Sequence, residues 1–260
     1  MKKFFIFILV LLSTITLNIP LQNTTRQPEN GSKPSPAAFY DSYNFYIKRN
    51  ANLHSPAPII KEPDKSKEPI SPFLDYLRKH HRNDDIVGYI NVHGTSISYP
   101  IVQDEHNSFY LDHNIQGRTD KAGWIFLDHQ NSLHQNEKNT IIYGHNMANG
   151  KRFGDIRHFG DINFFNKNRY ISLYTDYGIY TWEIFAFYIS DTNFNYIQVV
   201  FPKDTFAKFL NEIKRRNKHC MGINISCDDR IITLSTCAAK GDTNLRYVLH
   251  AKLIHNEMQS

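Results

Sequence analysis

This chain of 260 residues has few cysteines, few tryptophans and little excess charge of either sign. It contains 3 cysteines and 2 tryptophans, and its 30 basic residues stand against 25 acidic ones. The small positive excess is spread along the chain. Its tightest basic run, Lys214-Arg215-Arg216, lies where we expect a helix to end, and a helix C-terminus favours cations. No nucleic-acid-binding module is recognisable, so we expect no nucleic-acid partner.

The three cysteines are an odd number, so in an exported chain at least one thiol stays free or pairs with another chain. Cys220 and Cys227 share a short segment with glycine and asparagine, where they either form a local disulfide or remain unpaired loop thiols. Their spacing to Cys237 matches no standard zinc-ligand pattern, and the nearby His219 does not complete one. We expect no metal and no cofactor.

Long apolar runs are also scarce, and the one at the N-terminus is short for a membrane span. Two lysines precede an unbroken apolar run, Phe4 to Leu12, which a weakly polar stretch extends to Ile19. The pattern is typical of a secretory signal, but no small-x-small cleavage site follows it. A comfortable span needs ~20 apolar residues. We favour an uncleaved signal anchor over 1–21 to a cleaved signal, with the lysines inside and the rest of the chain outside.

Residues 22–69 are polar and interrupted by prolines, which prevent long helices and central strands. This composition predicts a spacer between the membrane and a folded domain at 70–260. One aromatic island, Phe39 to Ile47, either forms a short helix that docks on the domain or belongs to a partly ordered linker.

The domain alternates many short apolar runs with turns and has few helices, a pattern typical of a β-barrel or sandwich. A helix is expected from Pro72 to about Arg82, with the Ser71 hydroxyl as its N-cap. A second helix follows Asp204, which we expect to cap it, and its apolar stripe at i, i+3, i+4 and i+7 predicts core packing. The expected strands are 86–92, 96–102, 122–127, 140–143, 170–174, 179–188, 231–236 and 247–254.

Three residues suited to thiol chemistry adjoin apolar runs. The run 231–236 leads into Cys237, and Arg246 opens the next run. A thiol at the end of a buried strand is held rigidly yet faces the open edge of the sheet, and pairing of the two strands would bring the arginine beside it. The run 139–143 leads through a glycine to His145. A nucleophile, a proton donor and oxyanion support are what thiol acyl transfer requires.

These strand ends resemble those of the sortases, the cysteine transpeptidases of Gram-positive cell surfaces. The resemblance rests on Thr233-Leu234-Ser235-Thr236-Cys237 with the following Arg246, and on Tyr143-Gly144-His145-Asn146. It implies an eight-stranded, mostly antiparallel barrel with an N-terminal helical extension and a helix inserted before the cysteine strand. Segments from about Ile70 to Ile254 are similar, in order, to class B sortases in particular: DDIVGYI at 84–90, YPIVQ at 99–103, YLDHN at 110–114 and KAGWIFLD at 121–128.

The resemblance assigns roles to the three residues. Cys237 would be the nucleophile, and His145 the general acid for the leaving amine and then the general base for the incoming one. Arg246 would bind the substrate backbone and the developing oxyanion through its fixed fork of donors. On composition alone, other histidines near strand ends compete with His145. They are His113, His129 and His250.

Two further residues are candidates for substrate binding. Ser235 lies two positions before Cys237 and therefore on the same strand face. Asn114 matches a family position near the active cleft. For both residues, a purely structural hydrogen bond is an equally good interpretation. The loop from Ala238 to Leu245, between the cysteine and the arginine, is expected to be short.

The implied function is cleavage of a C-terminal sorting signal after Thr, with the acyl chain held on Cys237 and transferred to a peptidoglycan amine. The partners would be surface proteins with an NPxTN-like or PxTG-like motif, for wall anchoring or pilus assembly. Two alternatives remain, an extracellular cysteine peptidase or amidase without transfer and a catalytically idle adhesion module. Papain-like enzymes carry the cysteine at a helix N-terminus ahead of the histidine, whereas here the cysteine comes last and ends a strand.

Overall fold

A computed structural model describes residues 71–133, 137–191, 194–219, 224–239 and 242–258, with 237–239, 242–244 and 258 described as backbone only. All of them belong to the second of two units, Asp64–Ser260. The predicted anchor at 1–21, the spacer at 22–69 with its aromatic island, and Cys220 lie outside the described residues. Within the described ranges, no helix is both long and apolar enough to cross a membrane.

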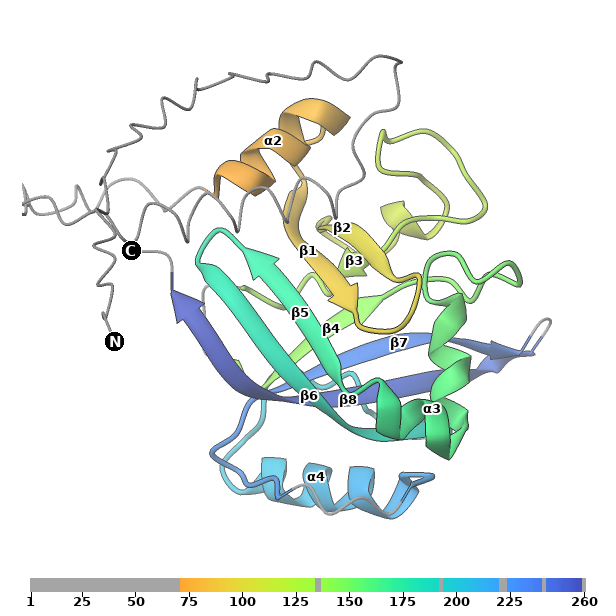
Figure 1. Cartoon of the computed structure of the whole chain (residues 1–260), viewed down its shortest axis with the longest axis vertical. Coiled ribbons are helices and arrows are strands. Elements are labelled where there is room, and N and C mark those ends of the chain that lie inside the picture. Colours follow the sequence, from red (N-terminus) through yellow and green to blue (C-terminus); the bar gives the residue numbers. More distant parts are fainter. Residues whose placement is uncertain (1–70, 134–136, 192–193, 220–223, 240–241, 259–260) are drawn as a thin grey trace, which may run out of the picture. The chain divides into compact units, whose positions relative to one another are not determined.

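Eight strands close into a barrel in the order β1-β2-β3-β4-β7-β8-β6-β5 (Figure 1). Most neighbours are antiparallel, but β2 pairs with β3, and β4 with β7, in parallel. The predicted eight-stranded, mostly antiparallel fold is therefore confirmed. The strands are β1 (Ile86–Val92), β2 (Ser98–Val102), β3 (Phe126–Leu127), β4 (Asn139–Tyr143), β5 (Tyr170–Thr175), β6 (Gly178–Ser190), β7 (Ile231–Ala239) and β8 (Asp242–Met258).

The main core fills the barrel with β-branched and aromatic side chains. Trp182 on β6 is 1% exposed, and Ile142, Leu234 and Leu249 on three neighbouring strands are each 0% exposed. Burial of one such side chain contributes ~1.5–3 kcal/mol. Side chains alternate along a strand, so every second residue points into the barrel and packs there. This packing fixes the strand ends, and with them the positions of the residues that follow each strand.

Helix α2 (Pro72–His81) packs Phe73, Leu74 and Leu77 against the barrel and ends at Arg82, which has a left-handed backbone conformation with φ 53°. The predicted helix is confirmed. The predicted Ser71 cap is wrong in its chemistry, because the serine side chain makes no cap hydrogen bond. Instead, the Ser71 backbone N–H donates to Oδ1 of Asp176 at 2.9 Å.

Helix α4 (Thr205–Arg216) covers a second apolar cluster with the predicted stripe, and it lies beside the barrel in Figure 1. The stripe residues Phe206, Phe209, Leu210 and Ile213 are at most 6% exposed. The helix ends on the predicted basic run. Asp204 occupies the cap position but makes no cap hydrogen bond. Its φ of 66° is left-handed, whereas a capping side chain reaches the first turn from an extended backbone.

Several bounds differ from the prediction. The first residues of the expected strand 96–102 form a turn, and only Phe126–Leu127 of 122–127 is strand, because Gly123 has a left-handed φ of 53°. The predicted loop 238–245 is wrong, since β7 runs to Ala239 and β8 starts at Asp242. Three short helices were not predicted: η1 (Phe109–Leu111), η2 (Gly154–Gly160) and α3 (Ile162–Lys167).

Candidate active site

Strand register brings the three predicted catalytic residues to one edge of the barrel. β4 and β7 run in parallel with Tyr143 opposite Ser235, and the Gly144 N–H donates to the Ser235 carbonyl at 3.3 Å. Two residues further along each chain come His145 and Cys237. In the antiparallel pair of β7 and β8, Cys237 is the direct register partner of Arg246. The cysteine and arginine strands do pair, which is the condition under which the arginine was expected beside the cysteine, although neither residue is at a strand end.

A cavity of about 570 Å³ opens at this edge and is more apolar than polar. Its lining includes His145, Arg246 and the two residues before Cys237, namely Ser235 and Thr236. Thr236 is 3% exposed, and within the described part of the chain its Oγ1 has no hydrogen-bond partner. The other lining residues are Asn107, Leu111, Phe126, Tyr143, Gly144, Phe194, Asn195, Tyr196 and Ile197.

His145 is oriented by the backbone of η1. Its Nε2 lies 2.6 Å from the Leu111 carbonyl oxygen. A carbonyl only accepts, so Nε2 carries a proton and donates it. The chain just beyond the histidine is also held, because the Phe153 N–H donates to the His145 carbonyl at 3.0 Å. The imidazole therefore has one defined tautomer and ring orientation.

Gly123 and Arg152 support this histidine from behind. A Cβ on Gly123 would lie 2.9 Å from Cδ2 of His145 and 2.6 Å from the carbonyl oxygens of Tyr110 and Leu111, so the close approach requires glycine. The Arg152 guanidinium stacks over Trp124 at 4.0 Å, and its Nε donates to the Gly123 carbonyl at 2.9 Å. Burial lowers the pKa of Arg152, and this cation–π contact and hydrogen bond compensate the buried charge.

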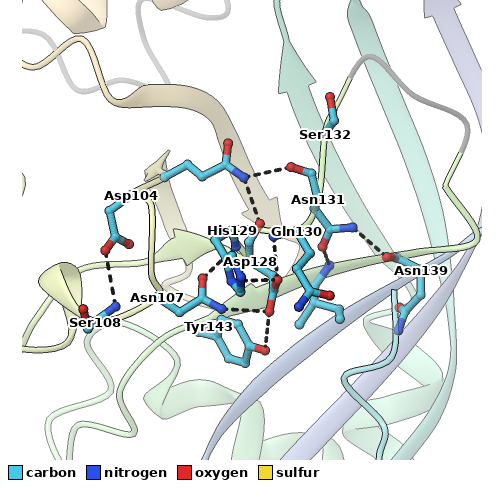
Figure 2. Close-up of polar contacts among 12 residues, drawn as sticks. Asp104, Asn107, Ser108, Asp128, His129, Gln130, Asn131, Ser132, Asn139 and Tyr143 are labelled. Atoms are coloured by element: carbon cyan, nitrogen blue, oxygen red, sulfur yellow. Dashed lines mark hydrogen bonds and ion pairs between the residues drawn. The ribbon is translucent and has the colours of Figure 1, made fainter. Parts of the chain in front are cut away.

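A buried carboxylate holds two residues of the cavity lining, Tyr143 and Asn107 (Figure 2). Asp128 is 5% exposed, and its Oδ2 accepts from the Tyr143 hydroxyl at 2.8 Å and from Asn107 Nδ2 at 3.0 Å. The Asn107 Oδ1 accepts from the His129 N–H at 2.7 Å, so both ends of this amide are held. Burial, and next the Asp128 charge, raise the pKa of Tyr143. This tyrosine remains a neutral donor at physiological pH.

Of the two predicted substrate-binding residues, only Ser235 lines the cavity. It is 3% exposed, and its Oγ lies 3.0 Å from the Tyr196 hydroxyl. The Asn114 Oδ1 instead accepts from the N–H groups of Gln116 and Arg118 at 3.0 and 3.1 Å, which closes a local turn. Asn114 is not among the described residues that line the cavity.

The competing histidines have other contacts. His250 is 0% exposed inside the barrel wall, and His129 lies 3.5 Å from Oδ1 of Asp128. His113 stacks on Phe109 with ring centroids 4.1 Å apart. Of these three and His145, only His145 lines the cavity. Cys227 is exposed and free, while Cys220 lies outside the described residues.

Several residues of this site could not be recognised from the sequence. Asn107, Tyr196 and Ile197 lie in irregular segments, and Asp128 acts only through its contacts. Asn107 has a left-handed φ of 58°, a conformation that asparagine tolerates well. Among the described residues, no group of three or more His, Cys, Asp or Glu is placed to hold a metal ion.

Comparisons with known proteins agree with the barrel and with the motifs. A sortase domain matches residues 90–254. Sortase B of Listeria monocytogenes is 40% identical over 174 residues, which cover 66% of this chain and 71% of that protein.

Two solved structures show the same fold. The Staphylococcus aureus sortase B–substrate complex superposes with a TM-score of 0.68 at 30% identity, covering 83% of this chain and 93% of that one. A sortase B complexed with triglycine superposes with a TM-score of 0.67 at 31% identity, covering 84% and 96%. Matched over most of its length by such relatives, the chain belongs to the sortase family of cysteine transpeptidases, and within it to class B.

Proposed function

We propose that this sortase uses Cys237 as nucleophile, His145 as proton donor and acceptor, and Arg246 as oxyanion and substrate-backbone ligand. The observation that carries the proposal is the strand register. The parallel pair β4–β7 carries His145 and Cys237 past the same level of the barrel, and β8 pairs Arg246 directly with the cysteine. His145 and Arg246 line one cavity, and the backbone register places Cys237 opposite Arg246, so separate segments of the chain bring together the residue types that acyl transfer requires.

In the proposed acylation step, the Cys237 thiolate attacks the carbonyl carbon of a substrate threonine. A C–S bond forms, the carbonyl oxygen becomes an oxyanion beside Arg246, and the C–N bond then breaks. The leaving amine takes a proton from His145. Because Nε2–H is held by the Leu111 carbonyl in either protonation state, the proton that moves is the one on Nδ1.

In the second step an amine attacks the thioester, and His145 Nδ1 takes up its proton as the thiolate leaves. The product carries a new amide bond, and the enzyme returns to its starting protonation state. Water in place of the amine would give hydrolysis. The lining of the cavity is more apolar than polar, and a site that excludes water would favour the amine.

We propose that the substrates are surface proteins with a C-terminal NPxTN-like or PxTG-like sorting motif, and that a peptidoglycan amine accepts the acyl chain. Two comparisons support this pairing, since relatives have been solved with a substrate and with triglycine, a short peptide that offers an amine. Ser235, which lines the cavity, would bind the sorting peptide. We retain Asn114 as a candidate that acts on the peptide only through its turn.

We further propose that the enzyme acts at the outer face of the cell membrane. The sequence of residues 1–21 supports a signal anchor, and the proline-rich residues 22–69 support a spacer that lets the catalytic domain 70–260 reach wall precursors. Protease treatment of intact cells tests this, because the domain should be cleaved from outside while a reporter fused at the N-terminus stays protected.

Matched substitutions test the residue roles. Cys237→Ala should abolish cleavage of a sorting-signal peptide, whereas Cys227→Ala, at an exposed thiol, should leave it unchanged. His145→Ala should lower turnover by roughly 10²–10⁴-fold, with His113→Ala as control. Arg246→Lys should fail because a point charge does not reproduce the guanidinium fork. Wild-type rates in Arg246→Lys would exclude the oxyanion role.

The transfer step needs a separate experiment. Purified full-length protein is incubated with each motif peptide, with and without oligoglycine or a diaminopimelate-bearing peptide, and the products are identified by mass spectrometry. A ligated product that depends on the amine, together with an acyl adduct on Cys237, is the expected result. Hydrolysis alone across the amine panel would instead favour a peptidase without transfer.

A further inference from the structure

One wall of the cavity is made by an irregular segment, Phe194–Gln198, between β6 and α4. Four consecutive residues of this segment line the cavity: Phe194, Asn195, Tyr196 and Ile197. The segment has no helical or sheet hydrogen bonds of its own to define its shape. Its backbone carbonyls therefore need other partners, and those partners determine where the wall stands.

Asn139, at the start of β4, supplies such partners from inside the protein. It is 0% exposed, and its Nδ2 donates to the Gln198 carbonyl at 3.0 Å and to the Tyr196 carbonyl at 3.3 Å. The two donor hydrogens of one amide thus hold carbonyls on either side of Ile197. The Asn139 backbone carbonyl accepts from Asn131 Nδ2 at 2.9 Å, which joins this residue to the network in Figure 2.

The orientation of the Asn139 amide is itself determined by a buried chain of donors. Thr233 Oγ1 donates its one hydrogen to Asn139 Oδ1 at 2.6 Å. In its contact with His250 Nδ1 at 2.9 Å it can therefore only accept. His250 is therefore the Nδ1–H tautomer, and its bare Nε2 accepts from the Tyr188 hydroxyl at 2.8 Å. Each donor in the chain points toward Asn139, so the amide has one allowed orientation.

The series of hydrogen bonds from Tyr188 to Asn139 is buried away from solvent. Thr233 and His250 are 0% exposed and Tyr188 is 2% exposed. Burial lowers the pKa of His250 to about 3, so the ring stays neutral and keeps the tautomer that the chain needs. The two residues closest to the wall, Asn139 and Thr233, do not line the cavity.

We propose that Asn139 is a positioning residue for substrate recognition. It holds Phe194–Gln198 at the distance at which this wall contacts the sorting peptide, and the Thr233 hydroxyl, which itself accepts from His250, keeps its amide in the required orientation. The proposal rests on the proposed function in naming a sorting peptide as the ligand. The attachment of the wall to Asn139 can be tested without any substrate.

The test compares two substitutions that each remove one buried hydroxyl of the chain. Thr233→Val takes away the donor to Asn139 Oδ1, so the amide loses the contact that fixes it and can shift away from the wall carbonyls. Tyr188→Phe removes only the hydroxyl that donates to His250 Nε2, and it leaves the hydrogen bond from Thr233 to Asn139 in place. Thr233→Ser keeps the hydroxyl at nearly the same place. All three are made in the full-length chain.

Steady-state cleavage of a sorting-signal peptide is measured first. Thr233→Val should raise KM about 10-fold, which corresponds to about 1.4 kcal/mol, with little change in kcat. Tyr188→Phe and Thr233→Ser should stay within about 2-fold of wild type. The rate at which a small methanethiosulfonate modifies Cys237 should be the same in all four proteins, because that reagent does not need the wall.

Hydrogen exchange of the backbone amides provides the reading that is independent of substrate. Exchange over 194–201 should be faster in Thr233→Val and unchanged in Tyr188→Phe. If Thr233→Val and Tyr188→Phe lose the same thermal stability and have the same KM, the buried hydrogen bonds contribute only to core packing, and the proposal is overturned. Unchanged hydrogen exchange over 194–201 in Thr233→Val would also overturn it. If the wild type cleaves no sorting peptide, the proposed function fails, and the exchange data still decide whether Asn139 holds the wall.

Discussion

The buried carboxylate of Asp128 joins two side chains of the cavity wall, and its contribution can be measured with a double-mutant cycle. One oxygen, Oδ2, accepts from both Tyr143 and Asn107, at 2.8 and 3.0 Å. Asp128→Asn keeps the shape of the side chain but removes the charge and replaces one oxygen with an NH₂ group. Whichever way the new amide turns, at least one former donor loses a charged acceptor or faces another donor.

The size of the effect follows from the burial of the carboxylate. A hydrogen bond to a charged group contributes roughly 1.5–3 kcal/mol, and an unsatisfied buried donor costs about 1–3 kcal/mol. Asp128→Asn should therefore lower the free energy of unfolding by about 3 kcal/mol. Tyr143→Phe should lower it by about 2 kcal/mol. Because both remove the same contact, the double variant should be less destabilised than the sum by about 2 kcal/mol.

Urea unfolding of the four proteins at pH 7 gives this coupling energy directly. The peptide-cleavage rate adds a second reading, since Asn107 and Tyr143 line the cavity, and kcat/KM should fall roughly 10-fold in Asp128→Asn. A coupling energy below about 0.5 kcal/mol, with cooperative unfolding in all four proteins, would refute the argument that the Asp128–Tyr143 bond is a strong charge-assisted contact.

Three other changes have defined outcomes. Gly123→Ala places a Cβ 2.9 Å from His145 at a φ of 53°, so melting temperature and peptide turnover should both fall. The loss of stability should exceed ~1 kcal/mol, whereas the same replacement at an unstrained glycine stabilises. The pKa of His250, about 3, lies below that of the unfolded chain. Below pH 6.5 the unfolded chain therefore binds a proton that the folded chain excludes, and urea titrations should show stability falling by up to ~1.4 kcal/mol per pH unit from this group. Arg78→Ala breaks a half-buried pair with Asp176 at 2.5 Å and should cost about 1–2 kcal/mol in thermal unfolding, between exposed and buried pairs.

Much of the barrel could be predicted from the sequence because the strands carry strong local patterns. Runs such as Ile86–Val92 and Ile231–Thr236 are β-branched and apolar, and turn residues separate them. The predictions of strand bounds fail where tertiary contacts determine the backbone conformation. The apolar run 122–127 is mostly not strand, since Gly123 has a left-handed φ, and Trp124 instead stacks with Arg152.

The candidate site was predictable only where a residue continues a strand. His145 and Cys237 follow or extend apolar runs, so their neighbourhood could be inferred. Asn107 and Tyr196 reach the cavity from irregular segments, whose course depends on side chains such as Asp128 and Asn139 far away in sequence. Asn114 shows the converse, since an asparagine near a glycine has a local use for its side chain, and here that use is a turn.

The parallel pairing of β4 and β7 explains why this barrel can bring together a histidine and a cysteine from distant parts of the sequence. Antiparallel neighbours leave the sheet at opposite edges, so residues after their last rungs diverge. Parallel neighbours leave at the same edge. The pairing of Tyr143 with Ser235 determines which residues of the two segments lie at the same level beyond that edge. A slip of one residue would turn every side chain of β7 to the other face of the sheet. Asn139 stands at the other end of the same ladder, opposite Ile231, and one rung on Thr140 faces Ile232. The buried bond from Thr233 to Asn139 is diagonal across these rungs, so it forms only in the correct register. The contact that orients the Asn139 amide therefore also favours the register that aligns His145 with Cys237.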